Sequence, residues 1–194
     1  MEKKKYTTAE YIPWDKATAL VRHLYNDGDF RMSLLVGCGI MFGLRFSDLS
    51  RLTWDQIMAD EFSLFEKKTG KYRTIKVNDS FKRHIMDCHK ALGISGSNQQ
   101  PCFLNRFGNI VSIQMVNRKL KEYNVRYRLN VKHVSSHALR KSFGRHVVEM
   151  AGENSEMALI KLSEIFGHTS VRVTRIYLGL RQQELEEIYD SLDF

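Results

Sequence analysis

Apolar residues recur along most of this chain at the three- and four-residue spacing of amphipathic helices. The pattern predicts a first helix over residues 15–25, with Asp15 as its N-cap and the turn Asn26–Gly28 as its end. A second helix is expected over residues 30–42, where nearly every position is apolar. Such a helix is buried on all sides and therefore central. Ser47 is expected to cap a short helix that follows.

The spacing changes at Glu61. Aromatic and β-branched residues over 62–65 and 72–77 predict two strands joined by a tight turn, Lys68–Lys71. A loop rich in Gly, Ser, Asn and Gln follows at 93–101. It is not expected to be a domain boundary, because the residues with candidate chemistry lie on both sides of it. Further helices are predicted over residues 79–92, 112–123, 137–151, 156–166 and 171–178.

These elements predict an α+β fold that is mostly α, a helical core with a small antiparallel β-sheet at its edge. One domain is expected over residues 15–180, after an N-terminal segment of residues 1–14. Residues 181–194 are expected to form an acidic amphipathic C-terminal helix with an apolar stripe on one face. The stripe consists of Leu185, Ile188, Tyr189 and Leu192.

The charge of the chain suggests its partner. The net charge is +8 and the isoelectric point is about 9.4, while the apolar and charged fractions are ordinary for a globular protein. A basic surplus of this size indicates a polyanionic partner, with nucleic acid first and an anionic membrane second. A basic protein without such a partner is the alternative. Lys and Arg concentrate in residues 66–83 and 118–145.

Several classes of protein do not fit the sequence. No apolar run approaches the length of a membrane span, about 20 residues, and no secretory leader is visible. The cysteines Cys38, Cys88 and Cys102 lie far apart and lack metal-site spacing. The sequence therefore predicts a cytoplasmic protein with free thiols, no membrane partner, no metal and no cofactor.

Two segments carry residues suited to binding a phosphate. Arg45 follows an apolar helix and a glycine, and a guanidinium fork suits phosphate oxygens. The alternative is an arginine at the edge of the core that pairs with Asp48. His137 and Arg140 are one turn apart on a predicted helix, so one can hold an oxygen while the other moves a proton. A surface helix of a basic protein explains that spacing equally well.

A histidine and a tyrosine near the C-terminus form a second candidate group. His168 follows a glycine at a predicted helix end, and Tyr177 lies nine residues later on the next helix. A tyrosine hydroxyl has a pKa of about 10, so it attacks well only beside a base and a cationic pocket. Lys68 in the hairpin can donate a proton to a leaving oxygen, with Lys67 and Lys71 as competitors. A structural histidine and a solvated turn are the alternatives.

Taken in order, the segments GLRFSDL, the Lys-Thr hairpin, HALRKSF and FGHTSVRVTRIY resemble the catalytic domain of the tyrosine recombinases, the phage integrase family. The resemblance covers residues 15–180, and Asp48 matches the acid that supports the first arginine. It implies a site made of Arg45 and Arg140 as phosphate-clamping arginines, His137 as the acid–base histidine, Lys68 as the hairpin lysine, His168 after the glycine, and Tyr177 as the nucleophile.

The resemblance also implies an activity. Tyr177 would attack the scissile phosphate of double-stranded DNA, leaving a 3′-phosphotyrosine and a free 5′-hydroxyl, with Lys68 or His137 assisting proton movement. A second strand would reverse the reaction without a cofactor, giving site-specific recombination in the DNA of a mobile element. A recombinase-like regulator that binds DNA without cutting it and a type IB topoisomerase-like enzyme are the alternatives.

The family further implies how the protein assembles. A homotetramer is expected on synapsed DNA and a monomer or weak oligomer without DNA, in the bacterial cytoplasm at the nucleoid. The acidic C-terminal helix would dock on a neighbouring protomer, with packing on its own core as the alternative. Family members usually carry a helical DNA-clamping domain before the catalytic one, where this chain has residues 1–14 alone.

Overall fold

The structure, a computed structural model, describes residues 10–66, 70–95, 98–180 and 189–192. The chain divides into two compact units, Met1–Phe143 and Gly144–Phe194. Helix α7, Ser136–Ala151, supplies residues to both units. Helices dominate, and one two-stranded antiparallel sheet accompanies them, so the predicted α+β fold that is mostly α is confirmed.

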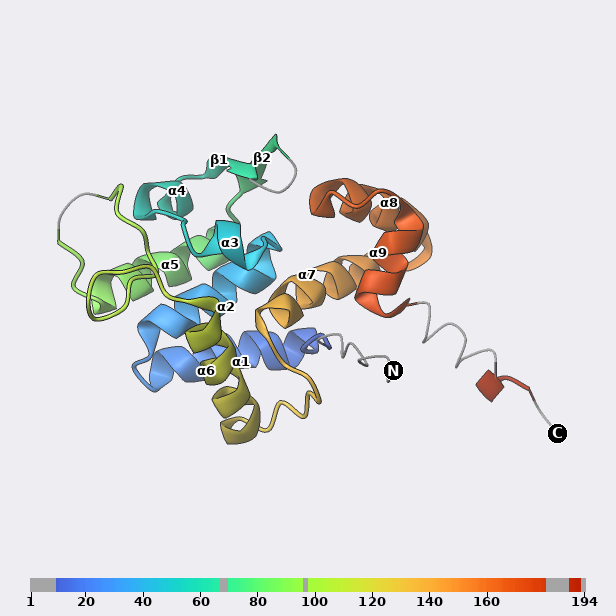
Figure 1. The fold of residues 1–194 in the computed structure, drawn as a ribbon, viewed down its shortest axis with the longest axis horizontal. Coiled ribbons are helices and arrows are strands. Elements are labelled where there is room, and N and C mark those ends of the chain that lie inside the picture. Colours follow the sequence, from blue (N-terminus) through green and yellow to red (C-terminus); the bar gives the residue numbers. More distant parts are fainter. Residues whose placement is uncertain (1–9, 67–69, 96–97, 181–188, 193–194) are drawn as a thin grey trace, which may run out of the picture. The chain divides into compact units, whose positions relative to one another are not determined.

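The first unit is built around one apolar helix, which neighbouring helices cover (Figure 1). Besides the start of α7, its elements are α1 (Trp14–Asn26), α2 (Phe30–Phe42), α3 (Phe46–Leu49), α4 (Trp54–Met58), β1 (Glu61–Glu66), β2 (Lys71–Lys76), α5 (Asp79–Ala91) and α6 (Ile113–Arg126). Helix α2 occupies the 13 residues that the sequence predicts for it.

The core of the first unit lies where α1 and α5 pack on α2. Leu20 of α1, Val36 of α2 and Ile85 of α5 are each 0% exposed. Ten of the 13 residues of α2 are buried, as expected for a helix that is apolar on every face. Burial on this scale is the main favourable term that holds the unit together. The buried packing of α2 therefore fixes the position at which the chain leaves this helix and enters the segment that contains Arg45.

The hairpin of β1 and β2 pairs in register from Glu61 opposite Lys76 to Glu66 opposite Lys71. Side chains of β1 alternate between exposed and buried, which places Phe62, Leu64 and Glu66 on the inner face. The first two positions are apolar, as a strand with one buried face requires. The third is a carboxylate, which is costly to bury unless it is paired.

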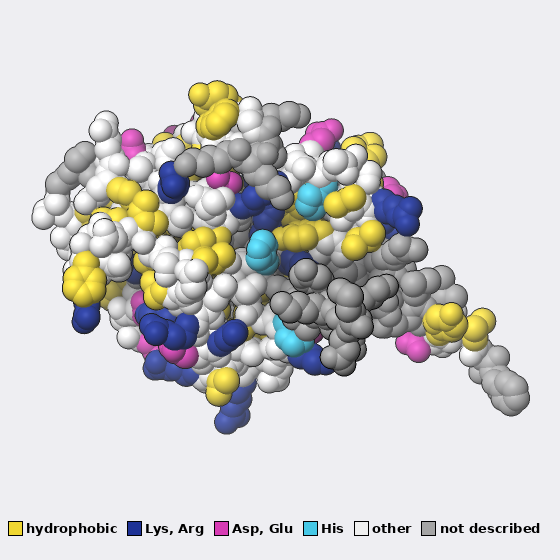
Figure 2. All heavy atoms as spheres, in the orientation of Figure 1, with side chains coloured by type: hydrophobic (Ala, Val, Ile, Leu, Met, Phe, Trp, Pro, Cys, Tyr) yellow, Lys and Arg dark blue, Asp and Glu magenta, His cyan; other side chains and the backbone are white. Residues whose placement is uncertain are grey.

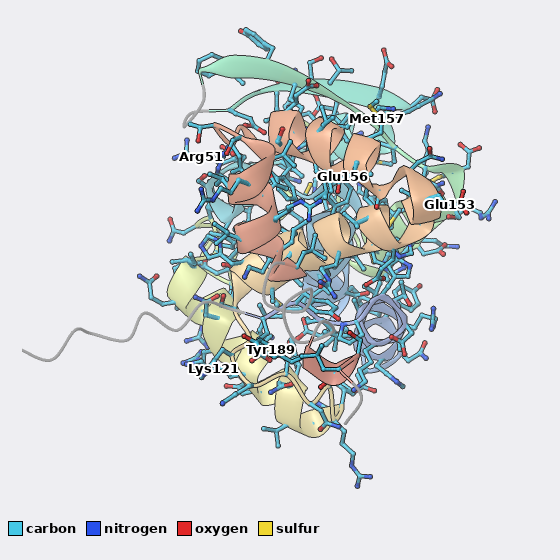
Figure 3. The ribbon with its side chains drawn as sticks, turned by 90° about the vertical axis from the view of Figure 1, so that its right-hand side faces the viewer. Arg51, Lys121, Glu153, Glu156, Met157 and Tyr189 are labelled. Atoms are coloured by element: carbon cyan, nitrogen blue, oxygen red, sulfur yellow. The ribbon has the colours of Figure 1, made fainter. Side chains whose placement is uncertain are left out.

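Helix α6 is fixed to the start of α2 by polar contacts. Asp29, the N-cap of α2, accepts hydrogen bonds from Lys119 Nζ and Tyr123 Oη, each at 2.6 Å. The opposite face of α6 is solvated, and Figure 2 shows Lys and Arg side chains over this helix. Lys121, labelled in Figure 3, is one of these exposed cations. The basic surplus of the sequence is thus partly displayed on α6.

The second unit packs two short helices against the end of α7. Its further elements are η1 (Gly152–Asn154), α8 (Ser155–Phe166) and α9 (Val171–Leu178). A Cβ atom on Gly144 of α7 would come within 2.6 Å of the Leu178 side chain, so glycine permits this close approach of α9. Across α8 and α9, Glu156 pairs with Arg175, and Figure 3 shows Glu156 on α8.

Three sequence-based expectations about local structure were wrong or incomplete. Asp15 lies in the first turn of α1, whose N-cap is Pro13. Ser47 lies inside α3, whose N-cap position is Arg45. Helix α4 was not expected, although the side chain of Gln56 accepts a hydrogen bond from the Thr53 backbone N–H in a capping box, a pattern visible in the sequence.

Candidate active site

The first candidate arginine follows a sharp turn at the end of α2. Gly43 ends the helix in the left-handed conformation, with φ of 56°. A Cβ atom at that position would lie 2.3 Å from the Phe143 ring, so both the backbone angle and the close approach require glycine. The chain then turns through Leu44 into Arg45, which is the N-cap residue of α3. The GLR segment is therefore a rigid corner that fixes the backbone of Arg45.

Arg140 reaches this same corner from α7. Arg140 is 4% exposed, and its Nη1 donates a hydrogen bond of 2.6 Å to the carbonyl oxygen of Gly43. That carbonyl belongs to the C-cap residue of α2, at the helix end where intrahelical hydrogen-bond partners are missing. The structure thus brings Arg140 to the turn that carries Arg45, two residues beyond Gly43.

Glu66 is the ionic partner of Arg45 that the sequence did not reveal. Arg45 Nη1 lies 2.9 Å from Glu66 Oε2, and Arg73 Nη1 lies 3.6 Å from Glu66 Oε1. Arg73 in turn donates a hydrogen bond of 2.7 Å from Nη2 to the carbonyl of Phe42. The available signal was an acid at an inward position of an alternating strand.

Asp48 is the second acid of this region and is 8% exposed. Burial raises the pKa of its carboxyl, and the negative charge of Glu66 raises it further. The charges of Arg45 and Arg140 act in the opposite direction. The charges of both arginines therefore act on the Asp48 carboxylate. The ion pair at 2.9 Å, by contrast, joins Arg45 to Glu66.

The remaining candidates of the first unit are less completely defined. His137 lies in the first turn of α7 and is exposed, one turn before Arg140 on the same helix. Lys67 and Lys68 lie outside the described residues. Lys71 begins β2. The choice of hairpin lysine among these three stays a prediction.

In the second unit, His168 and Tyr177 are neighbours. Their ring centroids are 5.2 Å apart, and each ring also meets the buried Phe166, at 5.4 and 5.6 Å. The structure therefore brings together the two residues that the sequence places nine positions apart. Gly167, in the left-handed conformation, turns the chain between α8 and His168.

The imidazole of His168 is oriented by a buried hydroxyl. Nδ1 of His168 lies 2.9 Å from Oγ1 of Thr174, which is 0% exposed. The backbone N–H of His168 also donates a hydrogen bond of 2.9 Å to the carbonyl of Ser163. Tyr177 follows Thr174 by three residues, so both side chains lie on one side of α9. Sequence reasoning missed Thr174, although the i, i+3 spacing to Tyr177 was a usable signal.

These groups supply the parts that phosphoryl transfer needs. Arginines stabilise charge on phosphate oxygens, histidines move protons near neutral pH, and a tyrosine hydroxyl can serve as nucleophile. Among the described residues, no group of three His, Cys, Asp or Glu side chains is arranged to hold a metal ion. Within the same part of the chain, no helix has the length and apolar character to cross a bilayer.

Comparison with known proteins gives consistent results. The model of the phage integrase family matches residues 11–184. The tyrosine recombinase XerC of Xylella fastidiosa (strain M23) is 32% identical over 150 residues, which are 77% of this chain and 48% of that protein. The chain thus spans about half the length of the curated relatives it matches.

Solved structures share the fold. The crystal structure of XerA recombinase superposes with a TM-score of 0.71 at 19% identity, covering 100% of this chain and 68% of that one. The XerH site-specific recombinase bound to a palindromic difH substrate, in a post-cleavage complex, has a TM-score of 0.68 at 18% identity. That likeness covers 97% of this chain and 55% of XerH. With its motifs, its fold and the matched residues in agreement, this chain belongs to the phage integrase family.

Proposed function

We propose that this chain is a site-specific DNA recombinase that cleaves and rejoins DNA strands through a 3′-phosphotyrosine intermediate. Its substrate is double-stranded DNA. The observation that carries the proposal is the hydrogen bond from Arg140 to Gly43, since it holds a second arginine at the corner that presents Arg45. Two guanidinium groups at one corner suit a phosphodiester whose charge increases in the transition state.

Each candidate residue has one role in the proposed reaction. The Tyr177 hydroxyl attacks phosphorus, the new O–P bond replaces the bond to the 5′-oxygen, and the DNA is left on the enzyme as a 3′-phosphotyrosine. The tyrosine proton passes to a neighbouring base, for which His168 is the candidate because its ring lies beside Tyr177. Lys68 or His137 gives a proton to the departing 5′-oxygen, and Arg45 and Arg140 hold the non-bridging oxygens.

The energy of the broken bond is retained in the phosphotyrosine. A 5′-hydroxyl from a second duplex can therefore attack it, release Tyr177 and complete strand exchange without a nucleotide cofactor. Relatives support this assignment, since XerH was solved with its difH substrate after cleavage. The exposed cations of α6, including Lys121, suit the backbone of the same DNA.

Finer features of the proposal concern assembly and location. A homotetramer would hold two duplexes for exchange, with a monomer or weak oligomer in the absence of DNA. A place at the nucleoid, in the bacterial cytoplasm, follows from the proposed DNA substrate. Of the apolar stripe expected to dock on a neighbour, Leu185 and Ile188 lie outside the described residues. Tyr189 and Leu192 are 71% and 69% exposed.

Covalent trapping tests the chemistry directly. The full chain is incubated with duplexes that carry a nick within randomised sequence, so that cleavage beside the nick releases a short oligonucleotide and leaves the protein attached. Adducts that survive denaturation are recovered and their DNA is sequenced. The comparison is with Tyr177→Phe, which removes only the hydroxyl, and with Tyr189→Phe, which removes an exposed hydroxyl elsewhere.

We expect an adduct with the wild type and with Tyr189→Phe, and none with Tyr177→Phe. An adduct that persists in Tyr177→Phe would show that another tyrosine is the nucleophile. DNA binding without any adduct would support a non-cleaving regulator instead. Relaxation of supercoiled plasmid by a protein that never joins two duplexes would indicate topoisomerase chemistry.

A further inference from the structure

Glu66 is a buried acid on the inner face of β1, where an apolar residue is expected. Phe62 and Leu64 precede it on the inner face of β1, and the Glu66 side chain is 4% exposed. A carboxylate is rarely buried so deeply without a partner that keeps it charged. It forms ion pairs with two arginines, Arg45 at 2.9 Å and Arg73 at 3.6 Å.

Arg73 ties one side of Glu66 to the end of α2. Its Nη2 donates a hydrogen bond of 2.7 Å to the carbonyl of Phe42. Burial lowers the pKa of the Arg73 guanidinium, and the charge of Glu66 acts in the opposite direction. Contacts therefore run from Phe42 through Arg73 and Glu66 to Arg45, which lies only three residues after Phe42.

This closed loop of contacts restricts the Arg45 side chain. A free arginine has about 2 kcal/mol of rotamer entropy, which must be lost before its fork can hold a phosphate. A fixed carboxylate bonded to Nη1 removes much of that freedom in advance, and such preorganisation favours a charged transition state. Because a carboxylate repels a phosphate, Glu66 is not suited to bind the phosphate itself, and its ion pair with Arg45 links it to a phosphate-binding residue.

The charges of the region agree with this role. Three guanidinium groups, on Arg45, Arg73 and Arg140, lie near two carboxylates, on Glu66 and Asp48. Buried cations without such acids would be costly before DNA arrives. With both acids ionised, the group keeps an excess of one positive charge, which suits a phosphodiester of charge −1.

We propose that Glu66 is a positioning residue, which holds the Arg45 guanidinium in the orientation that receives the scissile phosphate. The inference rests on the proposed function for the role of Arg45. It adds a residue from the hairpin to the machinery and explains why an acid occupies an inward position of β1.

A double-mutant cycle tests whether Glu66 acts through Arg45. Single-turnover cleavage of nicked DNA is measured for the wild type, Glu66→Gln, Arg45→Ala and the double variant. We expect Glu66→Gln to slow cleavage by about 10-fold, with a DNA dissociation constant within about 2-fold of the wild type. In the Arg45→Ala background, Glu66→Gln should have no further effect, because the residue it positions is gone. Equal effects in both backgrounds would overturn the proposal.

Glu61→Gln is the matched control, since Glu61 is an exposed acid at the other end of the same strand. It should cleave DNA at the wild-type rate. If Glu66→Gln fails to fold, Glu66→Asp replaces it, because aspartate keeps the charge but withdraws it by one methylene group. Positioning through Arg45 would be supported if Glu66→Asp slows cleavage in the otherwise wild-type protein but has no effect on cleavage when Arg45 is replaced by alanine.

Arginine side-chain NMR separates this inference from the proposed function. The guanidinium signals of Arg45, assigned with Arg45→Lys, should show hindered rotation in the wild type and faster rotation in Glu66→Gln. That outcome supports positioning even if the wild type forms no covalent adduct, in which case only the proposed function fails. Identical Arg45 signals in the two proteins would refute the positioning role even if cleavage slows.

Discussion

The guanidinium of Arg140 donates a hydrogen bond of 2.6 Å to the carbonyl of Gly43, 97 residues earlier in the chain. The contact satisfies a carbonyl at the end of α2 and at the same time places a cation at the corner that leads to Arg45. One bond thus serves both stability and the proposed chemistry. Removing the Arg140 side chain should therefore lower both the free energy of unfolding and the rate of DNA cleavage, and the two effects can be measured separately.

Arg140→Ala should abolish detectable adduct formation and also destabilise the fold. The Gly43 carbonyl would lose its partner in a buried setting, which costs about 1–3 kcal/mol. Arg140→Lys keeps a charge but not the planar fork, so it should recover part of the stability and little of the cleavage. Chemical denaturation and covalent trapping measure the two effects. Full cleavage by the lysine variant would contradict a bidentate role for Arg140.

Gly43→Ala should be more destabilising than Gly28→Ala. Both glycines have positive φ, 56° and 80°, so alanine costs about 1–2 kcal/mol at each from backbone strain alone. Only at Gly43 does a Cβ atom also meet a side chain, the Phe143 ring at 2.3 Å, while nothing lies within 4 Å at Gly28. Overpacking adds about 1–3 kcal/mol there. Equal unfolding free energies for the two variants would disprove the close approach.

Thr174→Val should impair cleavage through His168. The substitution removes the hydroxyl that lies 2.9 Å from His168 Nδ1 but keeps the branched shape of the side chain. We expect cleavage to slow by about 10-fold or more, because a misoriented imidazole transfers protons poorly. Thr174→Ser keeps the hydroxyl and should cleave at close to the wild-type rate. Equal cleavage rates for Thr174→Val and Thr174→Ser would show that the Thr174 hydroxyl has no role in the reaction.

Asp29 should make stability depend on pH. Burial would raise the pKa of its carboxyl, but hydrogen bonds from Lys119 and Tyr123 and the charge of Lys119 bring it below the ordinary 3.8. Because the folded pKa is lowered, the stabilisation is present above pH 3.8 and is lost as the pH falls through the folded value.

The unfolding free energies of the wild type and Asp29→Asn should therefore differ by about 1.5–3 kcal/mol at pH 7. The gap should shrink below pH 3.8. Urea denaturation across pH 2.5–7 provides the measurement. A gap that is the same at every pH would mean that the charge of Asp29 contributes nothing.

The cysteines should be unreactive in the folded protein. Burial raises the pKa of the Cys88 thiol to about 12, and it raises the pKa values of Cys38 and Cys102 as well. Since the thiolate is the reactive form, a disulfide reagent at pH 8 should modify none of them before unfolding and all three in guanidinium chloride. Rapid reaction of one thiol with the folded chain would show that its segment opens.

Much of the secondary structure followed from the sequence because local patterns decide it. Helices α2 and α9 have the bounds that apolar spacing predicts, and the hairpin lies where alternation begins. The errors were also local. Asp15 and Ser47 are good capping residues in positions where the chain begins its helices one or two residues earlier.

The sequence by itself determined the family, the order of the candidate residues and the helices that carry them, because these depend on residue type and short spacing. Only the tertiary structure decided which groups meet. Glu66 reaches Arg45 across 21 residues, and Arg140 reaches Gly43 across 97. Such pairings depend on how the hairpin and α7 pack around the end of α2, and packing is set by the whole core rather than by any local pattern.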